Sequence, residues 1–198
     1  MLFRSLRVLG LDPGTATFGW GVVESGGERI IHHAHGVILT EANRALGDRL
    51  AEIRDALVAI VREQRPDRVA IERIFNQGNV QSAVGIGAAR GIALLVASDL
   101  AIPLIEATPS EMKRAVAGDG RATKAAVTRA VTRLLGLGAA PTPNDAADAL
   151  GLAIWGGGAA RFERSAGASR ADRSAAQGIA AESGFDRAVR AALRAERR

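Results

Sequence analysis

Apolar residues change their spacing along this chain of 198 residues. Near the N-terminus they alternate with other residues, which is typical of strands, and further on they follow the 3.6-residue repeat of one helix face. Short apolar runs between turn residues indicate further strands. The expected strands cover residues 6–11, 18–23, 30–39, 69–75 and 102–107, and the expected helices cover 45–65, 80–98 and 124–135, with one more starting at 109 and a last one starting at 142.

The order of these segments predicts the class of fold. Three strands come first, then helix, strand, helix and strand, and then only helices, which favours an α/β sheet layered with helices. Thr108, Pro109 and Glu111 fit a capping box at the start of one helix. The last core helix is expected to fade at the three glycines 156–158.

Composition limits the class of protein. Cysteine is absent, which excludes disulfides and thiolate metal sites and is compatible with a cytoplasmic protein. No stretch reaches the roughly 18 uncharged apolar residues that span a bilayer. The N-terminal segment lacks the apolar core of a signal peptide. We therefore expect a globular, cytoplasmic protein that makes no use of a membrane.

The net charge of +5 gives little support for nucleic-acid binding by itself. Residues 165–198 carry seven Arg and four acidic residues, so the other 164 residues have a net charge of only +2. Beyond Arg164 the composition shifts to Ala, Ser, Gly and Arg, which predicts a core domain over residues 1–164 and a mobile basic tail over 165–198. Only two of the 26 basic residues are lysines, Lys113 and Lys124.

One carboxylate directly follows an apolar strand and another lies inside one. Asp12 follows the first apolar run, where an unpaired buried charge costs several kcal/mol. The alternative is a turn aspartate that bonds its own backbone before Pro13. Glu72 lies within a largely apolar strand, although glutamate is rarely buried without a partner. The alternative for Glu72 is a half-exposed strand. Both residues are candidate functional carboxylates.

Asp145 and Asp148 are three residues apart on the last helix, so their side chains face the same side. Asp145 by itself could simply complement the helix dipole. The sequence has no Lys or Arg between Asn144 and Gly158, which leaves both carboxylates without a local counter-charge. Four acids of this kind need a cation, and oxygen ligands suit Mg²⁺ or Mn²⁺. The sequence therefore predicts a metal site.

Three histidines near the third strand raise the possibility of a second metal site. Strict alternation would place His33 and His35 on one face of the strand and His32 on the other. A three-histidine site is therefore not expected, and we assign these residues a structural role.

Several short motifs occur in order along the chain. They are Leu9–Gly14 with Gly19 and Gly21, Ala70–Glu72 followed by Phe75 and Asn79, Ala88–Gly91, and Asp145–Leu150. This ordered set resembles the RuvC family of bacterial Holliday-junction resolvases. The similarity runs from about Leu6 to Ile154, and although each motif is short, the ordered set is specific.

The resemblance implies an RNase H-like fold with a mixed five-stranded sheet flanked by helices on both faces, and a homodimer. It implies that two Mg²⁺ or Mn²⁺ ions bind per active site and that paired cuts in four-way junction DNA leave 5′-phosphate and 3′-hydroxyl ends. It also implies a helicase complex of RuvA and RuvB as partner. The residues that the family pattern assigns to metal binding are Asp12, Glu72, Asp145 and Asp148, and those that it assigns to catalysis or DNA contact are Lys113, Lys124, Phe75, Asn79 and Arg90.

Other interpretations of the sequence remain open. Lys113 and Lys124 could be ordinary solvated lysines, and Phe75 a core residue at a strand end. A related nuclease that acts on ribosomal RNA precursor and a junction-binding module without catalysis are alternative functions. An actin-like phosphotransferase would match Asp12–Thr15, but it needs two such domains, which 198 residues do not supply. The expected function is thus a metal-dependent junction resolvase.

Overall fold

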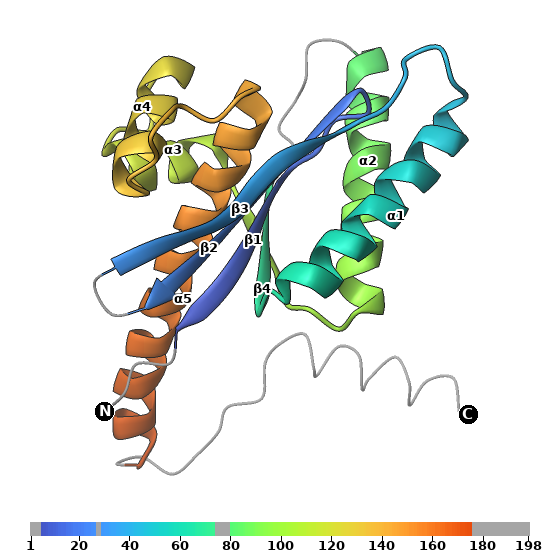
Figure 1. Ribbon diagram of the computed structural model, residues 1–198. Coiled ribbons are helices and arrows are strands. Elements are labelled where there is room, and N and C mark those ends of the chain that lie inside the picture. Colours follow the sequence, from blue (N-terminus) through green and yellow to red (C-terminus); the bar gives the residue numbers. More distant parts are fainter. Residues whose placement is uncertain (1–4, 27–28, 74–79, 176–198) are drawn as a thin grey trace, which may run out of the picture. The chain divides into compact units, whose positions relative to one another are not determined.

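A five-stranded mixed sheet forms the centre of the protein (Figure 1). The computed structural model describes residues 5–26, 29–73 and 80–175, with side chains in the last stretch described from 83 to 159. The strands are β1 (Leu6–Asp12), β2 (Thr17–Gly26), β3 (Arg29–Leu39), β4 (Arg68–Glu72) and β5 (Leu104–Ala107). The helices are α1 (Leu46–Gln64), α2 (Val80–Asp99), α3 (Pro109–Ala117), α4 (Lys124–Leu134) and α5 (Asn144–Ala175).

The sheet order is β3-β2-β1-β4-β5. The first three strands form an antiparallel meander, and β4 and β5 extend it in parallel with β1. Parallel neighbours need a crossover, and α1 and α2 supply it. The predicted α/β class and the mixed five-stranded sheet are confirmed, although β4 ends at Glu72, three residues before the predicted strand end.

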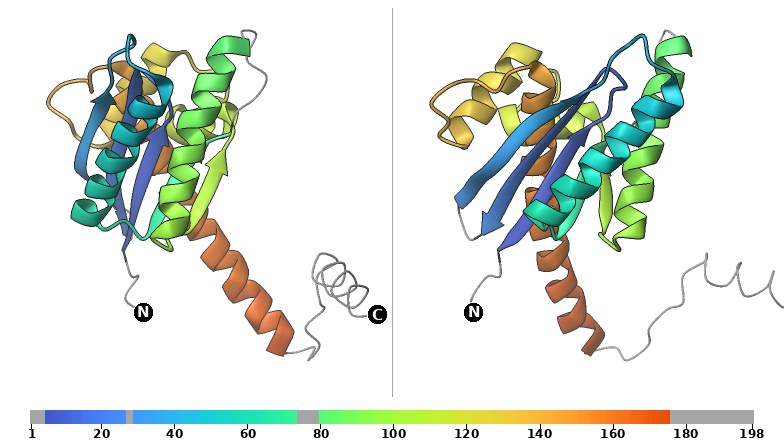
Figure 2. Two further views of the ribbon diagram at one scale, coloured as in Figure 1. Left: turned by 90° about the vertical axis from the view of Figure 1, so that its right-hand side faces the viewer. Right: turned by 45° about the vertical axis from the view of Figure 1, so that its right-hand side comes forward.

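Helices cover both faces of the sheet, as the two views of Figure 2 show. On one face, Leu9 and Ile71 pack with residues of α1 and α2. On the other face, their neighbours Val8 and Ala70 pack with residues of α3, α4 and α5. Because side chains alternate along a strand, each strand contributes to two separate cores. We call these the α1/α2 face and the α5 face.

Short helices on the α5 face begin where the sequence predicts. Thr108 accepts a hydrogen bond from the backbone of Glu111, and the Glu111 side chain accepts one from the backbone of Thr108. The predicted capping box of α3 is therefore confirmed. Thr123 caps α4 in the same manner by accepting from the backbone of Ala126. These caps fix the residues at which α3 and α4 begin, and with them the positions of Lys113 on α3 and Lys124 on α4.

Glycines allow α5 to lie directly on the sheet. A Cβ atom at Gly19 would stand 2.2 Å from the backbone oxygen of Asp145, and one at Gly10 would stand 2.0 Å from that of Ala149. Any larger residue would push the helix away, because packed backbones leave no space for a methyl group. The glycines of the first sequence motif therefore set the distance between α5 and the strands.

The predicted end of α5 was wrong. The helix continues past the three glycines 156–158 and ends at Ala175. A Cβ at Gly156 would stand 2.9 Å from that of Ala70, and one at Gly157 would stand 2.8 Å from that of Ser25. These two glycines let α5 pack closely against the strands, and they do not end the helix. The burial of α5 against the sheet outweighs their low helix propensity. By internal contacts residues 1–160 form one unit and 161–198 another.

The predicted faces of the histidines were also wrong. The register of β2 against β3 shifts by one residue opposite His33. This bulge places His32 and His35 together, with Nε2 of His32 2.8 Å from Nδ1 of His35. His33 instead bonds Glu24 at 2.9 Å. Strict alternation fails at a bulge because one strand carries an extra residue there.

Candidate active site

Asp12 and Glu72 end two neighbouring parallel strands. Leu11 of β1 pairs with Ile71 of β4, so the next residue of each strand is one of the two carboxylates. Gly10 and Ala70, two residues earlier, face α5, and alternation therefore directs Asp12 and Glu72 toward α5 as well. Two residues separated by 60 positions in the sequence thus meet at one edge of the sheet.

Asp145 and Asp148 approach this edge from α5. Gly19 pairs with Asp12 in the β1–β2 ladder, and the Asp145 Cβ lies 3.1 Å from the Cβ position built on Gly19. Asp148 follows one helical turn later, and its side chain is 17% exposed. The structure therefore gathers all four predicted carboxylates at one end of the sheet, on the α5 face.

Lys124 lies beside this cluster. Its Nζ is 3.3 Å from Oδ2 of Asp148, and its side chain is 75% exposed. Lys113, on α3, is half-buried and acts electrostatically on Glu72. The sequence has no Lys or Arg close to Asp145 and Asp148, and the fold brings Lys124 of α4 to Asp148 from a distant part of the chain.

The cluster carries more negative charge than Lys124 balances. Burial, followed by the charges of Asp148, Glu72 and Asp145, raises the pKa of Asp12 from 3.8 to about 7, although Lys124 lowers it. Burial and then Asp148 raise the pKa of Glu72, whereas Lys124 and Lys113 lower it. The charge of Asp148 is the main cause that raises the pKa of Lys124. Without a further cation, these carboxylates repel one another.

The donor set fits a divalent cation. Carboxylate oxygens are the ligands that Mg²⁺ and Mn²⁺ prefer. Within the described residues, no group of three or more Asp, Glu, His or Cys side chains has the spacing that would hold a metal ion. A bound cation would remove the repulsion, since it neutralises the charges that raise the pKa of Asp12.

The remaining predicted site residues lie elsewhere. Phe75 and Asn79 are outside the described residues, and their contacts with DNA stay predictions. Arg90 lies on the α1/α2 face, and its side chain is 14% exposed. Its Nη2 lies 2.7 Å from Oε1 of Glu106, and its Nε donates to the backbone oxygen of Glu72 at 3.3 Å. The contact of Arg90 with DNA stays a prediction.

Sequence reasoning passed over Glu106. It lies in β5, pairs with Ile71 of β4, and contacts both Arg90 and Arg73. A sequence signal existed, because Glu106 is an acid inside an apolar strand, as Glu72 is. Its interactions differ, however: Glu106 has arginine partners on the α1/α2 face, whereas Glu72 projects toward the other carboxylates.

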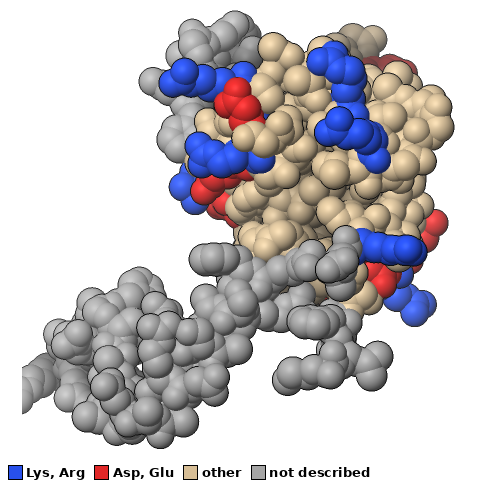
Figure 3. All heavy atoms as spheres, turned by 90° about the vertical axis from the view of Figure 1, so that its left-hand side faces the viewer, with Lys and Arg blue, Asp and Glu red and all other residues tan. Residues whose placement is uncertain are grey.

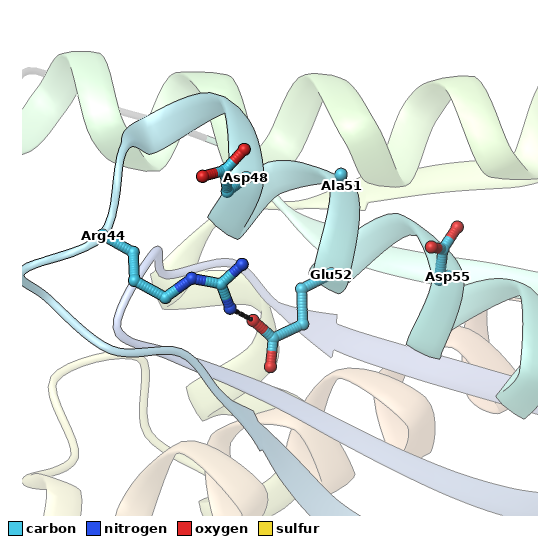
Figure 4. Close-up of a pocket in the computed structure, with 5 residues that line it drawn as sticks. All are labelled: Arg44, Asp48, Ala51, Glu52 and Asp55. Carbon is cyan, nitrogen blue, oxygen red and sulfur yellow. Dashed lines mark hydrogen bonds and ion pairs between the residues drawn. The ribbon is translucent and has the colours of Figure 1, made fainter.

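A shallow pocket on α1 also contains carboxylates but lies away from this site. Its lining residues are Arg44, Asp48, Ala51, Glu52 and Asp55 (Figure 4). Arg44 already pairs with Glu52, at 2.7 Å. The pocket faces outward from the helix that covers the α1/α2 face, so it does not add ligands to the cluster on the α5 face.

Positive charge does not mark a single DNA-binding patch on the face that Figure 3 draws. Lys and Arg side chains form separate groups there, around a surface that is largely uncharged. Specific acidic and basic side chains therefore indicate the function better than total charge does. Among the described helices, none is long and apolar enough to cross a membrane.

The mixed five-stranded sheet with helices on both faces is an RNase H-like fold. Residues 8–155 match the family described as crossover junction endodeoxyribonuclease RuvC. A relative of that name from Salinispora arenicola is 46% identical over 172 residues, which cover 85% of this chain and 98% of the relative. The RuvC structure from Thermus thermophilus has a TM-score of 0.73 at 31% identity and covers 79% of this chain and 96% of its own. A structure of that protein in complex with Holliday-junction substrate gives a TM-score of 0.72, at 29% identity with the same coverage.

The chain belongs to the RuvC family of crossover junction endodeoxyribonucleases. It is therefore a nuclease that hydrolyses DNA, and its activity depends on divalent metal, as is general in the family. The expected family, fold and enzyme class are confirmed.

Proposed function

We propose that this chain resolves Holliday junctions by cutting two strands of like polarity at paired, symmetric positions. The observation that carries this proposal is the meeting of Asp12, Glu72, Asp145 and Asp148 at one edge of the sheet, with a pKa of about 7 at Asp12. Such a cluster binds cations strongly, and the family to which the chain belongs cuts crossover junctions. We place this activity in residues 1–164 and in the cytoplasm, and treat 165–198 as an accessory tail.

Two Mg²⁺ or Mn²⁺ ions per site would be held by the four carboxylates. When bound, such ions supply Lewis acidity to both the attacking and the departing oxygen of the phosphodiester. Asp12 and Glu72 would provide ligands from the rigid sheet, and Asp145 and Asp148 from α5. Placing ligands on strands and a buried helix limits their movement, which favours accurate positioning of the phosphate.

Lys124 would act on the scissile phosphate. Its ammonium group is beside Asp148 but 75% exposed, so an approaching phosphate can reach it. The raised pKa of Lys124 keeps it cationic at neutral pH. Stabilisation of charge on the phosphate in the transition state follows from this position. Lys113 would contribute in the same direction from α3.

A homodimer would place two such sites on one junction. Helix α2 supports this proposal, since its exposed positions include Val84 and Leu95, with Gly87 and Gly91 between them. A Cβ at either glycine meets no described residue within 4 Å, so the surface has room for the helix of a second copy. A two-fold dimer suits a four-way junction, because two equivalent sites then meet two equivalent strands.

Further contacts complete the proposal. Phe75 would stack on an unpaired base, a contact worth roughly 1–3 kcal/mol. Asn79 would contact DNA nearby, and RuvA and RuvB would present the junction to the dimer. These roles follow from the family pattern, with Phe75 and Asn79 outside the described residues.

Cleavage of a synthetic four-way junction tests the proposal. Each strand is labelled in turn, Mg²⁺ or Mn²⁺ is added, and a linear duplex of the same sequence serves as control. We expect paired nicks at symmetric positions that DNA ligase seals without prior processing, and no cutting of the duplex. Equal cutting of the duplex would contradict junction selectivity, and binding without nicks would indicate a junction-binding module.

A further inference from the structure

Arg90 forms two interactions that converge on the end of β4. Its Nη2 lies 2.7 Å from Oε1 of Glu106, and its Nε donates to the backbone oxygen of Glu72 at 3.3 Å. The side chain is 14% exposed, compared with 35% for Glu106. Arg90 thus uses its guanidinium inside the protein, underneath a proposed metal ligand.

The position of these contacts in the sheet is informative. Glu72 is the last residue of β4 and pairs with Ala107 of β5. One further backbone bond, from Arg73 to Ala107 at 2.7 Å, follows that pair. Arg90 reaches this strand end from α2, on the α1/α2 face, while the Glu72 side chain projects to the α5 face. The arginine therefore holds the backbone from which the carboxylate extends.

The carboxylates of Glu106 and Glu72 have different surroundings. Glu106 contacts Arg90, and its other oxygen lies 3.5 Å from Nε of the more exposed Arg73. The Glu72 carboxylate lies among acids on the opposite face. Without Arg90, Glu106 would keep only the longer contact with Arg73 among the ion pairs described. The backbone oxygen of Glu72 would lose its hydrogen bond from Arg90 of α2.

We propose that Arg90 is a positioning residue that, together with Glu106, fixes the Glu72 carboxylate for metal binding. The inference rests on the proposed function in one respect, namely that Glu72 is a metal ligand. An arginine suits this role better than a lysine, because its planar guanidinium donates in two directions at fixed spacing, to Glu106 and to the Glu72 backbone. A lysine ammonium is a single point charge. Outer partners of this kind tune metal affinity by about 10–100-fold. Helix α2, which carries the proposed dimer surface, thereby also contacts the backbone of a proposed metal ligand through Arg90.

Metal binding in the absence of DNA provides the first test. Mn²⁺ affinity is measured by calorimetry on the full chain and on Arg90→Gln, Glu106→Gln and Arg90→Lys. We expect Arg90→Gln and Glu106→Gln each to weaken Mn²⁺ binding by about tenfold, and Arg90→Lys to give a smaller loss because it keeps the charge. Arg54→Gln is the matched control, since it removes one positive charge from an exposed pair on α1. Its Mn²⁺ affinity should equal that of the unmodified chain.

Junction binding and cleavage provide the second test. We expect the Arg90 and Glu106 variants to bind a four-way junction as the unmodified chain does, to lose kcat rather than to raise KM, and to recover part of kcat in excess Mn²⁺. If Arg90 instead contacts a phosphate, Arg90→Gln will weaken junction binding and leave Mn²⁺ affinity unchanged. The slope of log junction affinity against log salt concentration will then become shallower by about one. That result would overturn the proposal.

The two proposals fail in different ways. If the unmodified chain cuts no junction, the proposed function fails, yet the Mn²⁺ affinities still decide the role of Arg90. If Arg90→Gln does not fold, Arg90→Lys and Glu106→Gln decide it, because the first keeps the charge and the second removes the acid instead. Equal Mn²⁺ affinity in both of these variants and in the unmodified chain would contradict the positioning role.

Discussion

The two faces of the sheet treat carboxylates in opposite ways. On the α5 face, Asp12 and Glu72 lie among other acids, and burial and like charge raise their pKa values. On the α1/α2 face, Glu106 stands on the neighbouring strand and pairs with Arg90 at 2.7 Å. Glu72 and Glu106 are the same type of residue on neighbouring strands of one sheet. What distinguishes a proposed metal ligand from a structural acid is therefore the charge supplied by the covering helices.

This difference has a physical consequence. An acid with an arginine partner is electrically satisfied and gains little from a cation. An acid held among other acids gains more from a bound cation, because the cation offsets the cost of its desolvation and removes the repulsion between the carboxylates. In the β4–β5 ladder, Glu106 pairs with Ile71 and Glu72 belongs to the next pair. Because side chains alternate along a strand, these two neighbouring acids project to opposite faces of the sheet.

The largest expected effect is on cleavage by ligand variants of the α5 face. Asp12→Asn and Glu72→Gln should each lower kcat by about 10³-fold or more, since each removes a proposed ligand at the reacting phosphate. Junction binding should stay largely intact, as measured by gel shift in the presence of Ca²⁺. Glu106→Gln, on the other face, should lower kcat by only about tenfold. Retained cleavage together with lost binding in Asp12→Asn would contradict the assignment.

The next effect concerns stability against pH in the absence of metal. Because the pKa of Asp12 is about 7 in the folded protein and 3.8 ordinarily, the folded state binds more protons between these values. The free energy of unfolding should therefore fall as the pH rises from about 4 to 7. Asp12→Asn removes this loss and should be more stable than the unmodified chain at about pH 8, by on the order of 2–4 kcal/mol.

Thermal unfolding in EDTA at several pH values measures this effect. At about pH 4 the two proteins should differ little, because Asp12 is then protonated in the folded state. Glu106→Gln is the comparison from the α1/α2 face, and it should show no gain in stability at about pH 8. An identical pH dependence of unfolding for Asp12→Asn and the unmodified chain would contradict the proposed electrostatics.

A smaller effect is expected from the contact between β2 and α5. Gly19→Ala should destabilise the fold by about 1–3 kcal/mol, the usual effect of overpacking, because the new Cβ would stand 2.2 Å from the Asp145 backbone oxygen. It should also weaken Mn²⁺ binding by displacing Asp145. Gly47→Ala, on α1, is the control, since a Cβ there meets nothing within 4 Å. Equal unfolding midpoints for the two variants in denaturant would contradict the close packing of α5.

The smallest effect belongs to Lys124. Lys124→Gln should lower kcat by about tenfold, less than the 10²–10³-fold typical of a buried donor to transition-state charge. The reason is its exposure of 75%, which leaves the ammonium screened by water and salt. Lys124→Arg should recover part of the rate. Single-turnover cleavage at saturating protein measures both variants, and a change in junction affinity without a change in rate would contradict the role.

Periodicity and turn residues were sufficient to predict most of the fold. The strand-helix order and the capping box at Thr108 were confirmed, and α5 starts at Asn144, two residues after the predicted start at 142. The end of α5 was not, because local helix propensity at 156–158 ignores the sheet that those glycines pack against. The faces of the histidines were wrong for a similar reason, since a bulge depends on the pairing of two strands.

The candidate site was predictable as a set of acids but not as an electrostatic balance. Asp12 and Glu72 could be selected because they are acids in or directly after apolar strands, and Asp145 and Asp148 because they share one helix face with no Lys or Arg near them in the sequence. The contact of Lys124 with Asp148 joins residues on different helices, so no local pattern indicates it. The pairing of Arg90 with Glu106 likewise depends on tertiary packing.

Anomalous diffraction from crystals grown with Mn²⁺ tests the central claim most directly. The claim is that the α5 face of the sheet, and not the α1/α2 face, is the metal-binding face. We predict Mn²⁺ peaks enclosed by Asp12, Glu72, Asp145 and Asp148, and their loss in crystals of Asp12→Asn. Mn²⁺ at Glu106 or at the α1 pocket beside Asp48, with none among the four carboxylates, would contradict the account.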